Sequence, residues 1–453
     1  MKTFNQASLS FLILATILAL CGSLSCGQQR NSARDRVSKT YPDALSKIVG
    51  ILVKEYDADR VSKTYPDSLS KIVGILVKEY DADWYHRQFD GWREQTRQDP
   101  KDEFAWLNGF KALNYQLMFA HQDYSVVDSI KLSFLEEMRR SIPDTYTYYY
   151  SAYKSVTSRE SVTSREEEYE YGWKAFHLIP DKKDFDDYDT WYAFLKRVGD
   201  KQYCPAFSKD YYSSGIYPEE LFTANMNDLN CMDEGSIYVG IGDAKVIPKW
   251  LIQDAMGKHN DKLVLCYDYF ADEDYCQRLY DELGIGEVPE MKEAFSRLIE
   301  QGCDIQRAPY DMYVQYVINE VSVRTGRKLF LGKYAGRSFY AMWDRMGSLY
   351  DFGLSYVISQ GEPEDWINEL GRRLWQCDFQ YLSQPLDKDS WRAVSLDSFN
   401  LSKNLMWLLW EYKDTDNPLY DKLYSIVEKA VNRIYDQDLR ERGMRNLSSL
   451  DIK

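Results

Sequence analysis

The sequence predicts an α+β fold, in which an N-terminal stack of helical hairpins precedes an α/β domain with a small, mostly parallel sheet and a helical C-terminal tail. Three observations predict it. Apolar and aromatic residues recur at intervals of three and four within residues 36–225. Short β-branched and aromatic runs alternate with helix-like stretches in residues 226–360, and helical spacing returns in residues 361–453. The first and third patterns are typical of amphipathic helices, the second of parallel β-α-β units.

The first 25 residues have the layout of a signal peptide, with Lys2 near the start and an apolar run at residues 9–20. That run has 12 residues, whereas a helix needs roughly 20 to cross a bilayer. The large residue before Cys21 fits a signal peptidase poorly, and the residues before Cys26 form a passable lipobox. We therefore predict a lipid on Cys26, a linker at residues 26–35 and membrane attachment through the lipid alone. A plainly secreted product is the alternative.

Composition excludes several classes of protein. The net charge of −15 and the pI near 5.0 oppose phosphate backbones, so we expect no nucleic-acid partner. No CxxC pair, HExxH or G-x-S-x-G occurs, and the histidines are scattered, which predicts no metal site, no cofactor and no hydrolase triad. The mature chain keeps six further cysteines, which we expect to be free and buried, with pairing in an oxidising periplasm as the alternative. They are Cys204, Cys231, Cys266, Cys276, Cys303 and Cys377.

Two direct repeats interrupt the helical region. Residues 36–59 recur as residues 60–83 with one difference, Ala44 against Ser68, and a six-residue sequence is duplicated within residues 155–166. Solenoid repeats share apolar positions and diverge elsewhere, so copies this similar indicate a recent duplication or an artefact of sequencing or assembly. Each 24-residue copy has one stretch of helical spacing behind a Pro-Asp pair. One copy is redundant, and we expect the first to pack poorly.

The region after the repeats has the pattern of helical hairpins. Aromatic residues from Trp84 to Trp92 lie on one face of a helix, and a second helix starts near Asp102 after an Asp99-Pro100 turn. A helix, a short Asp-Pro turn and a helix containing AWLN resemble tetratricopeptide hairpins, although the full 34-residue consensus is absent. Further helices are predicted at residues 125–140, 145–153, 167–177 and 186–198.

The α/β region has four strand candidates. Two of them flank a helix-like stretch within about 35 residues, as a parallel β-α-β unit does. The candidates are residues 235–243, 261–270, 327–332 and 352–359, with helices expected at 248–258, 272–283 and 310–324.

The first of these units carries a family resemblance. GIGDAKVIPKWLIQ resembles the GDNDTxPxWxLQ stretch in the soluble C-terminal part of bacterial protein O-mannosyltransferase-like membrane proteins and of related lipoproteins. TGRKLFLG and SLYDFGLSYVIS resemble the later strands of that family, and the sequence from Trp84 resembles the helical module preceding them in the lipoproteins. The resemblance implies the architecture and no activity, because the catalytic carboxylates belong to a membrane part that does not match. Ala244 and Lys245 stand where the family has Asn-Asp, so half of an acidic pair is replaced.

Four residues form the predicted ligand-binding site: Asp243, Lys245, Trp250 and Asp268. Asp243 follows the first predicted strand, at the carboxyl end where open α/β sheets bind ligands. The alternative interpretation is structural, with Asp243 capping the next helix and Gly242 allowing the tight turn. We predict no catalytic residue.

The sequence thus indicates a cell-envelope lipoprotein, in the outer membrane or facing the periplasm, that acts as a non-enzymatic binding or scaffolding module for an envelope protein or glycan. Two alternatives remain open. An exposed row of the abundant Tyr and Trp side chains would favour a surface glycan-binding lipoprotein. A pocket where the four site residues converge near Asp243 would favour an unrecognised or degenerate enzyme.

Overall fold

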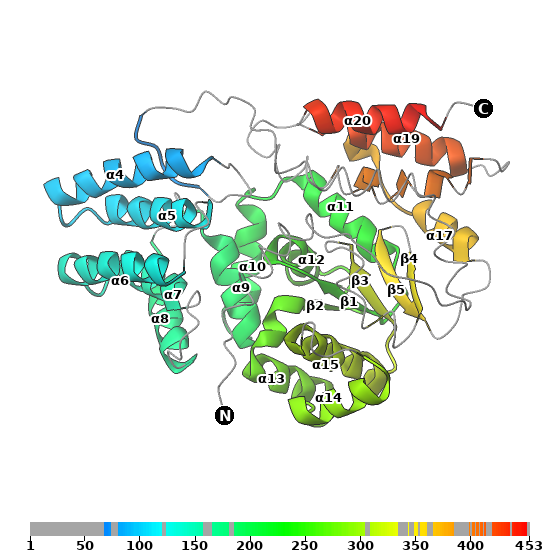
Figure 1. Cartoon of the computed structure of the whole chain (residues 1–453), viewed down its shortest axis with the longest axis horizontal. Coiled ribbons are helices and arrows are strands. Elements are labelled where there is room, and N and C mark those ends of the chain that lie inside the picture. Colours follow the sequence, from blue (N-terminus) through cyan, green and yellow to red (C-terminus); the bar gives the residue numbers. More distant parts are fainter. Residues whose placement is uncertain are drawn as a thin grey trace. The chain divides into compact units, whose positions relative to one another are not determined.

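The computed structural model describes residues 68–73, 80–119, 124–156, 165–180, 185–303, 309–333, 348–351, 354–359, 366–384, 419–434 and 437–450, with single positions and short runs between 343 and 413. The described chain is mostly helical with one small sheet, which confirms the α+β class (Figure 1). It forms two compact units that divide after Phe194. The signal peptide, Cys26, the linker and the first repeat copy lie outside the described residues.

Unit 1 consists of helices packed in pairs. Its elements are α4 (Ala82–Gln98), α5 (Glu103–Phe119), α6 (Tyr124–Ser141), α7 (Tyr146–Val156), α8 (Arg165–His177) and the first part of α9 (Tyr188–Val198). Helix α4 packs along α5 and α7 along α8, while α5 also contacts α6 and α7 (Figure 1).

Capping residues mark where the two helices on either side of the predicted Asp-Pro turn begin. The side chain of Asp81 accepts a hydrogen bond from Trp84 N at 2.8 Å and begins α4. Asp102 accepts from Ala105 N at 3.0 Å directly before α5. Each carboxylate satisfies an amide that has no partner within its helix. The helix–turn–helix predicted around Asp99 is therefore confirmed.

Aromatic side chains fill the interior of unit 1. The predicted inner face of α4, from Trp84 to Trp92, is buried. Four tyrosines of α7 are also buried, and Tyr150 and Tyr153 contact the ring of Trp191 on α9. The tyrosine-rich sequence of α7 thus forms part of the core of unit 1.

The second repeat copy differs from its prediction where it is described. Residues 68–73 lie outside any helix, although their apolar spacing matched one. The amides of Ser70 and Ile72 donate to side chains of α4 and α5 instead of to carbonyls of their own segment. Tertiary hydrogen bonds here outweigh a weak local preference.

Unit 2 contains a five-stranded sheet in the order β2-β1-β3-β5-β4. The strands are β1 (Ile237–Gly240), β2 (Leu263–Cys266), β3 (Leu329–Gly332), β4 (Ser348–Asp351) and β5 (Ser355–Ser359). Strand β1 is parallel to β2 and β3, whereas β5 is antiparallel to both β3 and β4. The sheet is therefore mixed rather than mostly parallel. The three-residue connection from β4 to β5 permits only an antiparallel pair, and β4 was not among the predicted strands.

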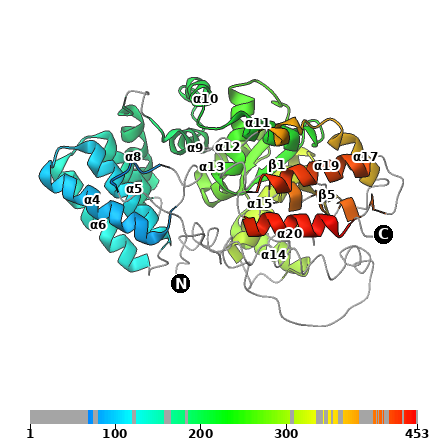
Figure 2. The same cartoon turned by 90° about the horizontal axis from the view of Figure 1, so that it is seen from above.

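Helices surround this sheet. They are the end of α9, then α10 (Cys204–Ser213), α11 (Glu219–Asn230), α12 (Asp243–Asp254), α13 (Glu273–Leu283), α14 (Met291–Glu300), α15 (Pro309–Thr325), α17 (Trp366–Leu374), α19 (Leu419–Asn432) and α20 (Gln437–Ser448), with short 3-10 turns η2 (Tyr267–Ala271) and η4 (Gln380–Ser383). Helix α12 connects β1 to β2 and packs on both strands. In the tail, α19 lies beside α20 in both views, and η4 contacts α11 and α19 (Figures 1 and 2).

The division after Phe194 precedes the end of the helical region expected at residue 225. The reason is packing, because α10 and α11 both contact α12 and therefore belong with the sheet. Helical spacing shows that a segment buries one face but not which unit covers that face.

We predict that Gly172→Ala destabilises unit 1. An added Cβ would lie 2.6 Å from a ring carbon of Phe194, which is itself buried. Overpacking costs about 1–3 kcal/mol, which exceeds the gain of up to about 1 kcal/mol in helix propensity. Urea denaturation of the two proteins measures the difference. In the control Gly109→Ala, the nearest side-chain atom is 3.3 Å away, so the loss should be smaller. Equal or greater stability of Gly172→Ala would contradict the packing argument.

Candidate functional site

Residues 68–73 lie against α4, and side chains of that helix hold their backbone. Gln88 Oε1 accepts from Ser70 N at 2.8 Å, and Trp92 Nε1 donates to Ser70 O at 3.2 Å. Gln88 Nε2 also donates to Ser68 O at 3.1 Å. Both backbone groups of Ser70 thus bond to the same helix. In an extended strand the N–H and C=O of one residue point to the same side, so this segment is bound as an edge strand would be.

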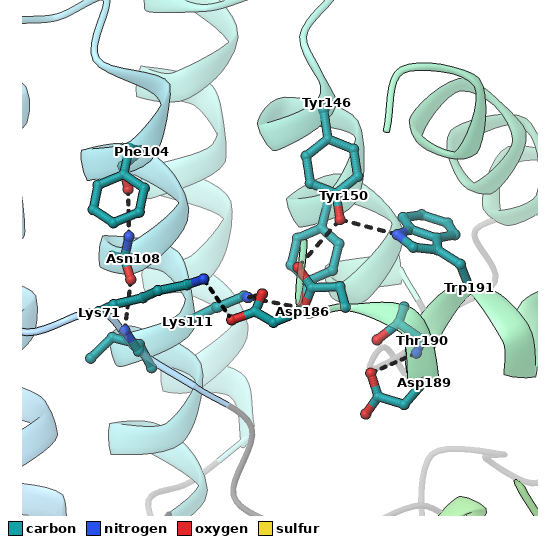
Figure 3. Close-up of polar contacts among 12 residues, drawn as sticks. Lys71, Phe104, Asn108, Lys111, Tyr146, Tyr150, Asp186, Asp189, Thr190 and Trp191 are labelled. Carbon is teal, nitrogen blue, oxygen red and sulfur yellow. Dashed lines mark hydrogen bonds and ion pairs between the residues drawn. The ribbon is translucent and has the colours of Figure 1, made fainter. Parts of the chain in front are cut away.

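Asn108 of α5 continues the pattern two residues further on. Its Oδ1 accepts from Ile72 N at 2.7 Å, while its Nδ2 donates to Phe104 O at 2.8 Å (Figure 3). Asn108 is buried, and Ile72 is only 1% exposed. A buried amide side chain needs hydrogen-bond partners, and here the bound segment supplies one of them.

Side chains of the segment also meet features of unit 1. An added Cβ at Gly91 would lie 2.7 Å from Leu69 Cδ1, so Leu69 rests against bare helix backbone. Lys71 Nζ pairs with Asp186 Oδ2 at 3.1 Å (Figure 3). We call the surface formed by Gln88, Gly91, Trp92, Asn108 and Asp186 the segment site.

A buried cluster of charges lies beside the segment site. Lys111 Nζ of α5 is 2.9 Å from Asp187 Oδ1 and 3.3 Å from Asp186 Oδ1. The side chains of Lys111 and Asp187 are 8% and 10% exposed, and Asp186 is half-buried. Because Asp186 forms ion pairs with both Lys71 and Lys111, the bound segment and this cluster share one carboxylate.

Two tyrosines and a tryptophan complete the cluster. The hydroxyls of Tyr146 and Tyr150 donate to the two oxygens of Asp187, each at 3.3 Å. Trp191 Nε1 donates to Tyr146 Oη at 3.0 Å (Figure 3). The cluster therefore connects α5, α7 and the start of α9. We refer to Lys111, Asp186, Asp187, Tyr146 and Tyr150 as the Lys111 cluster.

The protonation states of Lys111, Tyr146 and Tyr150 indicate a structural role for these residues rather than a catalytic one. Burial alone would lower the pKa of Lys111, but the charges of Asp187 and Asp186 outweigh it and raise that pKa above its ordinary value. Burial, followed by the charge of Asp187, raises the pKa values of Tyr146 and Tyr150 well above the ordinary value. A general base or amine nucleophile needs a pKa near the operating pH. These three groups stay protonated near neutrality and so position their neighbours.

The predicted site in unit 2 lies at the turn between β1 and α12. Gly242 has φ +80 and precedes α12, which begins at Asp243. Asp268 Oδ2 accepts from Gly242 N at 2.9 Å, and Lys245 N donates to Gly242 O at 3.1 Å. The structure therefore brings Asp268 to the turn that starts α12, at the carboxyl end of β1. It also shows why glycine stands at position 242, since a side chain would be strained at this φ.

Trp250, the fourth predicted residue, packs in the core. Its Nε1 donates to Val264 O of β2 at 2.9 Å, and its ring centroid is 5.7 Å from that of Tyr269. It is 3% exposed. Trp250 thus joins α12 to the sheet in the core, whereas Asp268 accepts a hydrogen bond from Gly242 N at the turn before α12.

Sequence reasoning did not predict that Lys249 and Lys111 are buried in ion pairs. Lys249 of α12 has a fully buried side chain, and its Nζ is 2.6 Å from Asp228 Oδ2 and 2.5 Å from Asn225 Oδ1. Its Nζ also lies 4.5 Å from the ring centroid of Tyr238. Lys111 is the counterpart in unit 1. In the sequence, each of these lysines lies on the apolar face of a predicted helix. A lysine in that position is expected to be buried and therefore to need an acidic partner elsewhere in the chain.

Within the described ranges, no three histidine, cysteine or acidic side chains gather in a way that could hold a metal ion. No helix in that part of the chain is both long and apolar enough to cross a membrane. No protein family, curated protein or solved structure matches the chain.

We predict that Lys111→Met destabilises the protein by about 3–5 kcal/mol, because it leaves a buried carboxylate without its cation. Lys174→Met is the matched control, since Lys174 pairs with Glu170 on an exposed surface of the same unit. An exposed pair contributes at most about 1 kcal/mol. Chemical denaturation at pH 7 measures both changes. Similar losses in the two variants would contradict the role of the buried pair.

The raised pKa values also fix the sign of a pH dependence. A group whose pKa is higher in the folded state contributes stability below its unfolded pKa and loses that contribution as the pH rises. The ordinary values are 10.5 for Lys111 and 10.0 for the two tyrosines. Stability contributed by the cluster should therefore fall above about pH 10. In urea denaturation, the difference in free energy of unfolding between the wild type and Lys111→Met should therefore become smaller as the pH rises above about 10.

Proposed function

We propose that this chain is a non-enzymatic binding module of the cell envelope, anchored by a lipid on Cys26, in which the tetratricopeptide-like helix pairs of unit 1 bind an extended peptide. The observation that carries the proposal is the binding of residues 68–73 at the segment site. Gln88, Trp92 and Asn108 bond to the backbone of that segment. Capture of an extended chain through its main chain is a recurring mode of peptide recognition, with side-chain contacts adding specificity.

The contacts define the class of partner. An apolar side chain is required at the buried position of Ile72, and one fits at the partly exposed position opposite Gly91, where Leu69 packs. A cation between them is favoured by Asp186, which pairs with Lys71. The partner is therefore an envelope protein that presents an extended apolar-x-cation-apolar sequence.

The repeat supplies a second copy of this ligand within the chain. Residues 44–49 read ALSKIV and residues 68–73 read SLSKIV. The one difference is Ser68, which contributes its carbonyl oxygen to Gln88. A carbonyl is present whichever residue stands there, so the first copy can make the same contacts with the segment site.

A peptide-binding experiment tests the proposal. A labelled peptide of residues 66–75 is titrated into the full-length protein in which Leu45, Ile48, Leu69 and Ile72 are each replaced by Asp, so that neither tethered copy competes. We expect saturable binding that adding Asn108→Ala abolishes, because a buried amide of Ile72 would lose its acceptor. Adding Gln98→Ala, an exposed amide on α4, should leave binding unchanged. The wild type should bind on the order of 10²-fold more weakly, because a tethered ligand acts at an effective concentration in the millimolar range.

Absence of binding to the four-substituted protein, with its fold intact by circular dichroism, would contradict a peptide-binding role. Equal binding by the Asn108→Ala and Gln98→Ala proteins would show that the peptide uses another surface.

The geometry gives less support to the glycan-binding and enzymatic alternatives. In the described part of the chain, the large aromatic rings that are more than a third exposed belong to Phe104, Tyr212 and Trp375, which lie on separate elements. They form no row for stacking sugars. Trp250 packs in the core, and Lys111, Tyr146 and Tyr150 stay protonated near neutrality.

The lipid anchor is tested by intact mass. Wild-type protein from a membrane fraction should carry a diacylglyceryl increment on its mature N-terminus, and Cys26→Ala should abolish it. Cys21→Ala is the matched control and should keep the increment. An unmodified wild-type mass in the soluble fraction would favour the secreted alternative.

A further inference from the structure

Two buried thiols of unit 2 lie within sulfur contact distance. Cys231 caps the C-terminus of α11, and Cys377 lies three residues after the end of α17. Their sulfur atoms are 3.4 Å apart, although the residues are 146 positions apart in the sequence. A disulfide bond is about 2.05 Å long, so a closure of about 1.4 Å, divided between the two side chains, would form one.

Neighbouring hydrogen bonds fix the backbone on both sides of this pair. Asn227 Nδ2 donates to Asp378 O at 2.6 Å, and Asp378 N donates to Asn227 Oδ1 at 2.9 Å. Arg373 Nη1 donates to Cys231 O at 2.8 Å. The chain next to each cysteine is thus tied to the chain that carries the other. The two sulfurs are held together by more than the packing of their own side chains.

We propose that Cys231 and Cys377 form a structural disulfide bond that joins α11 to the segment following α17. The oxidant is a disulfide, either a thiol–disulfide oxidoreductase in its oxidised form or a small-molecule disulfide, RSSR. One cysteine, as its thiolate, attacks RSSR, forming a mixed disulfide and releasing RS⁻. The thiolate of the second cysteine attacks the cysteine sulfur of that mixed disulfide, forms the Cys231–Cys377 bond and releases the second RS⁻. The two cysteine protons end on the two RSH molecules, so the two thiols are oxidised as RSSR is reduced.

The environment of the pair determines when this reaction can occur. The neighbouring Cys377, followed by burial, raises the pKa of Cys231 well above its ordinary value. Thiol–disulfide exchange requires a thiolate with access to its partner. The bond therefore forms while this part of unit 2 is still folding or transiently open. Once formed, it resists reduction in the folded protein.

The bond would also close a long loop. A cross-link between distant positions stabilises mainly by restricting the unfolded chain, and the effect increases with loop length. The loop closed here includes the whole five-stranded sheet, because all its strands lie between the two cysteines.

The test starts with reduced, full-length mature protein, refolded with and without oxidised glutathione. Thiols are then blocked with an alkylating reagent under denaturing conditions, followed by trypsin digestion and mass spectrometry. The expected product is a cross-linked pair of peptides, residues 210–245 and 374–388, each of which contains one cysteine. Its mass should be about 2 Da below the sum of the two reduced peptides. Recovery of both peptides only in alkylated form would overturn the proposal.

Thermal unfolding separates the bond from ordinary packing effects. The midpoint of the oxidised wild type should exceed that of the reduced protein by about 5–15 °C. Cys231→Ser and Cys377→Ser should each abolish this redox-dependent difference, whatever their effect on the reduced protein. Cys303→Ser, at another buried cysteine, should retain it. Because glutathione supplies the oxidant, the result does not depend on export. Loss of the difference in Cys303→Ser, or its survival in Cys231→Ser, would assign the redox effect to other thiols and overturn the proposal.

Discussion

The cost of burying a charge organises this structure, and the ammonium group of Lys111 shows it most directly. An unpaired charge in a protein interior is so unfavourable that it must meet opposite charge and hydrogen-bond donors or acceptors. Lys111 meets Asp186 and Asp187, and Asp187 in turn accepts from Tyr146 and Tyr150. One lysine on α5 therefore fixes the positions of α7 and of the chain before α9. Lys111 is also connected to residues 68–73, because Asp186 pairs with Lys71 as well.

The same constraint operates in unit 2. Lys249 is fully buried on α12 and pairs with Asp228 and Asn225 on α11, so these two helices have one relative register. At the C-terminal end of α11, the guanidinium of Arg373 bonds to the carbonyl of Cys231 and to Asp233. The helices of the tail thus attach to α11 through polar contacts as well as apolar ones. A network of this kind tolerates little displacement, because each lost contact leaves a buried polar group without a partner.

Both proposals arise from places where distant segments satisfy each other's polar groups. The backbone of residues 68–73 supplies partners that the side chains of Gln88 and Asn108 need, and the proposed peptide ligand would supply the same partners. The reciprocal pair between Asn227 and Asp378 holds Cys231 and Cys377 in contact. In each case a short segment is recognised through its main chain. The proposed peptide binding in unit 1 and the proposed cross-link in unit 2 therefore both follow from the need of buried polar groups for partners.

Much of the fold could be predicted because local spacing carries it. The face from Trp84 to Trp92 and the helix start near Asp102 have only one reasonable interpretation, and the helices and strands of the first β-α-β unit follow from the change in period. The candidate site was less predictable. The sequence brought attention to Asp268 and Gly242, which do meet at the turn before α12. It gave no means of knowing that Trp250 packs against β2 or that Ile72 donates to Asn108.

The sequence by itself determined which segments form helices and strands, because periodicity and capping act over a few neighbouring residues. It also determined the charge, the signal-like N-terminus and the near-identical copies at residues 36–59 and 60–83. Tertiary structure alone decided that the sheet is mixed, that residues 68–73 are bound outside a helix, and which residues neutralise Lys111 and Lys249. The contacts of residues 68–73 with unit 1 and the ion pairs of the two lysines join positions 18 to 115 apart along the chain. Such pairings leave no local pattern, because their energy comes from burial that exists only after the chain has folded.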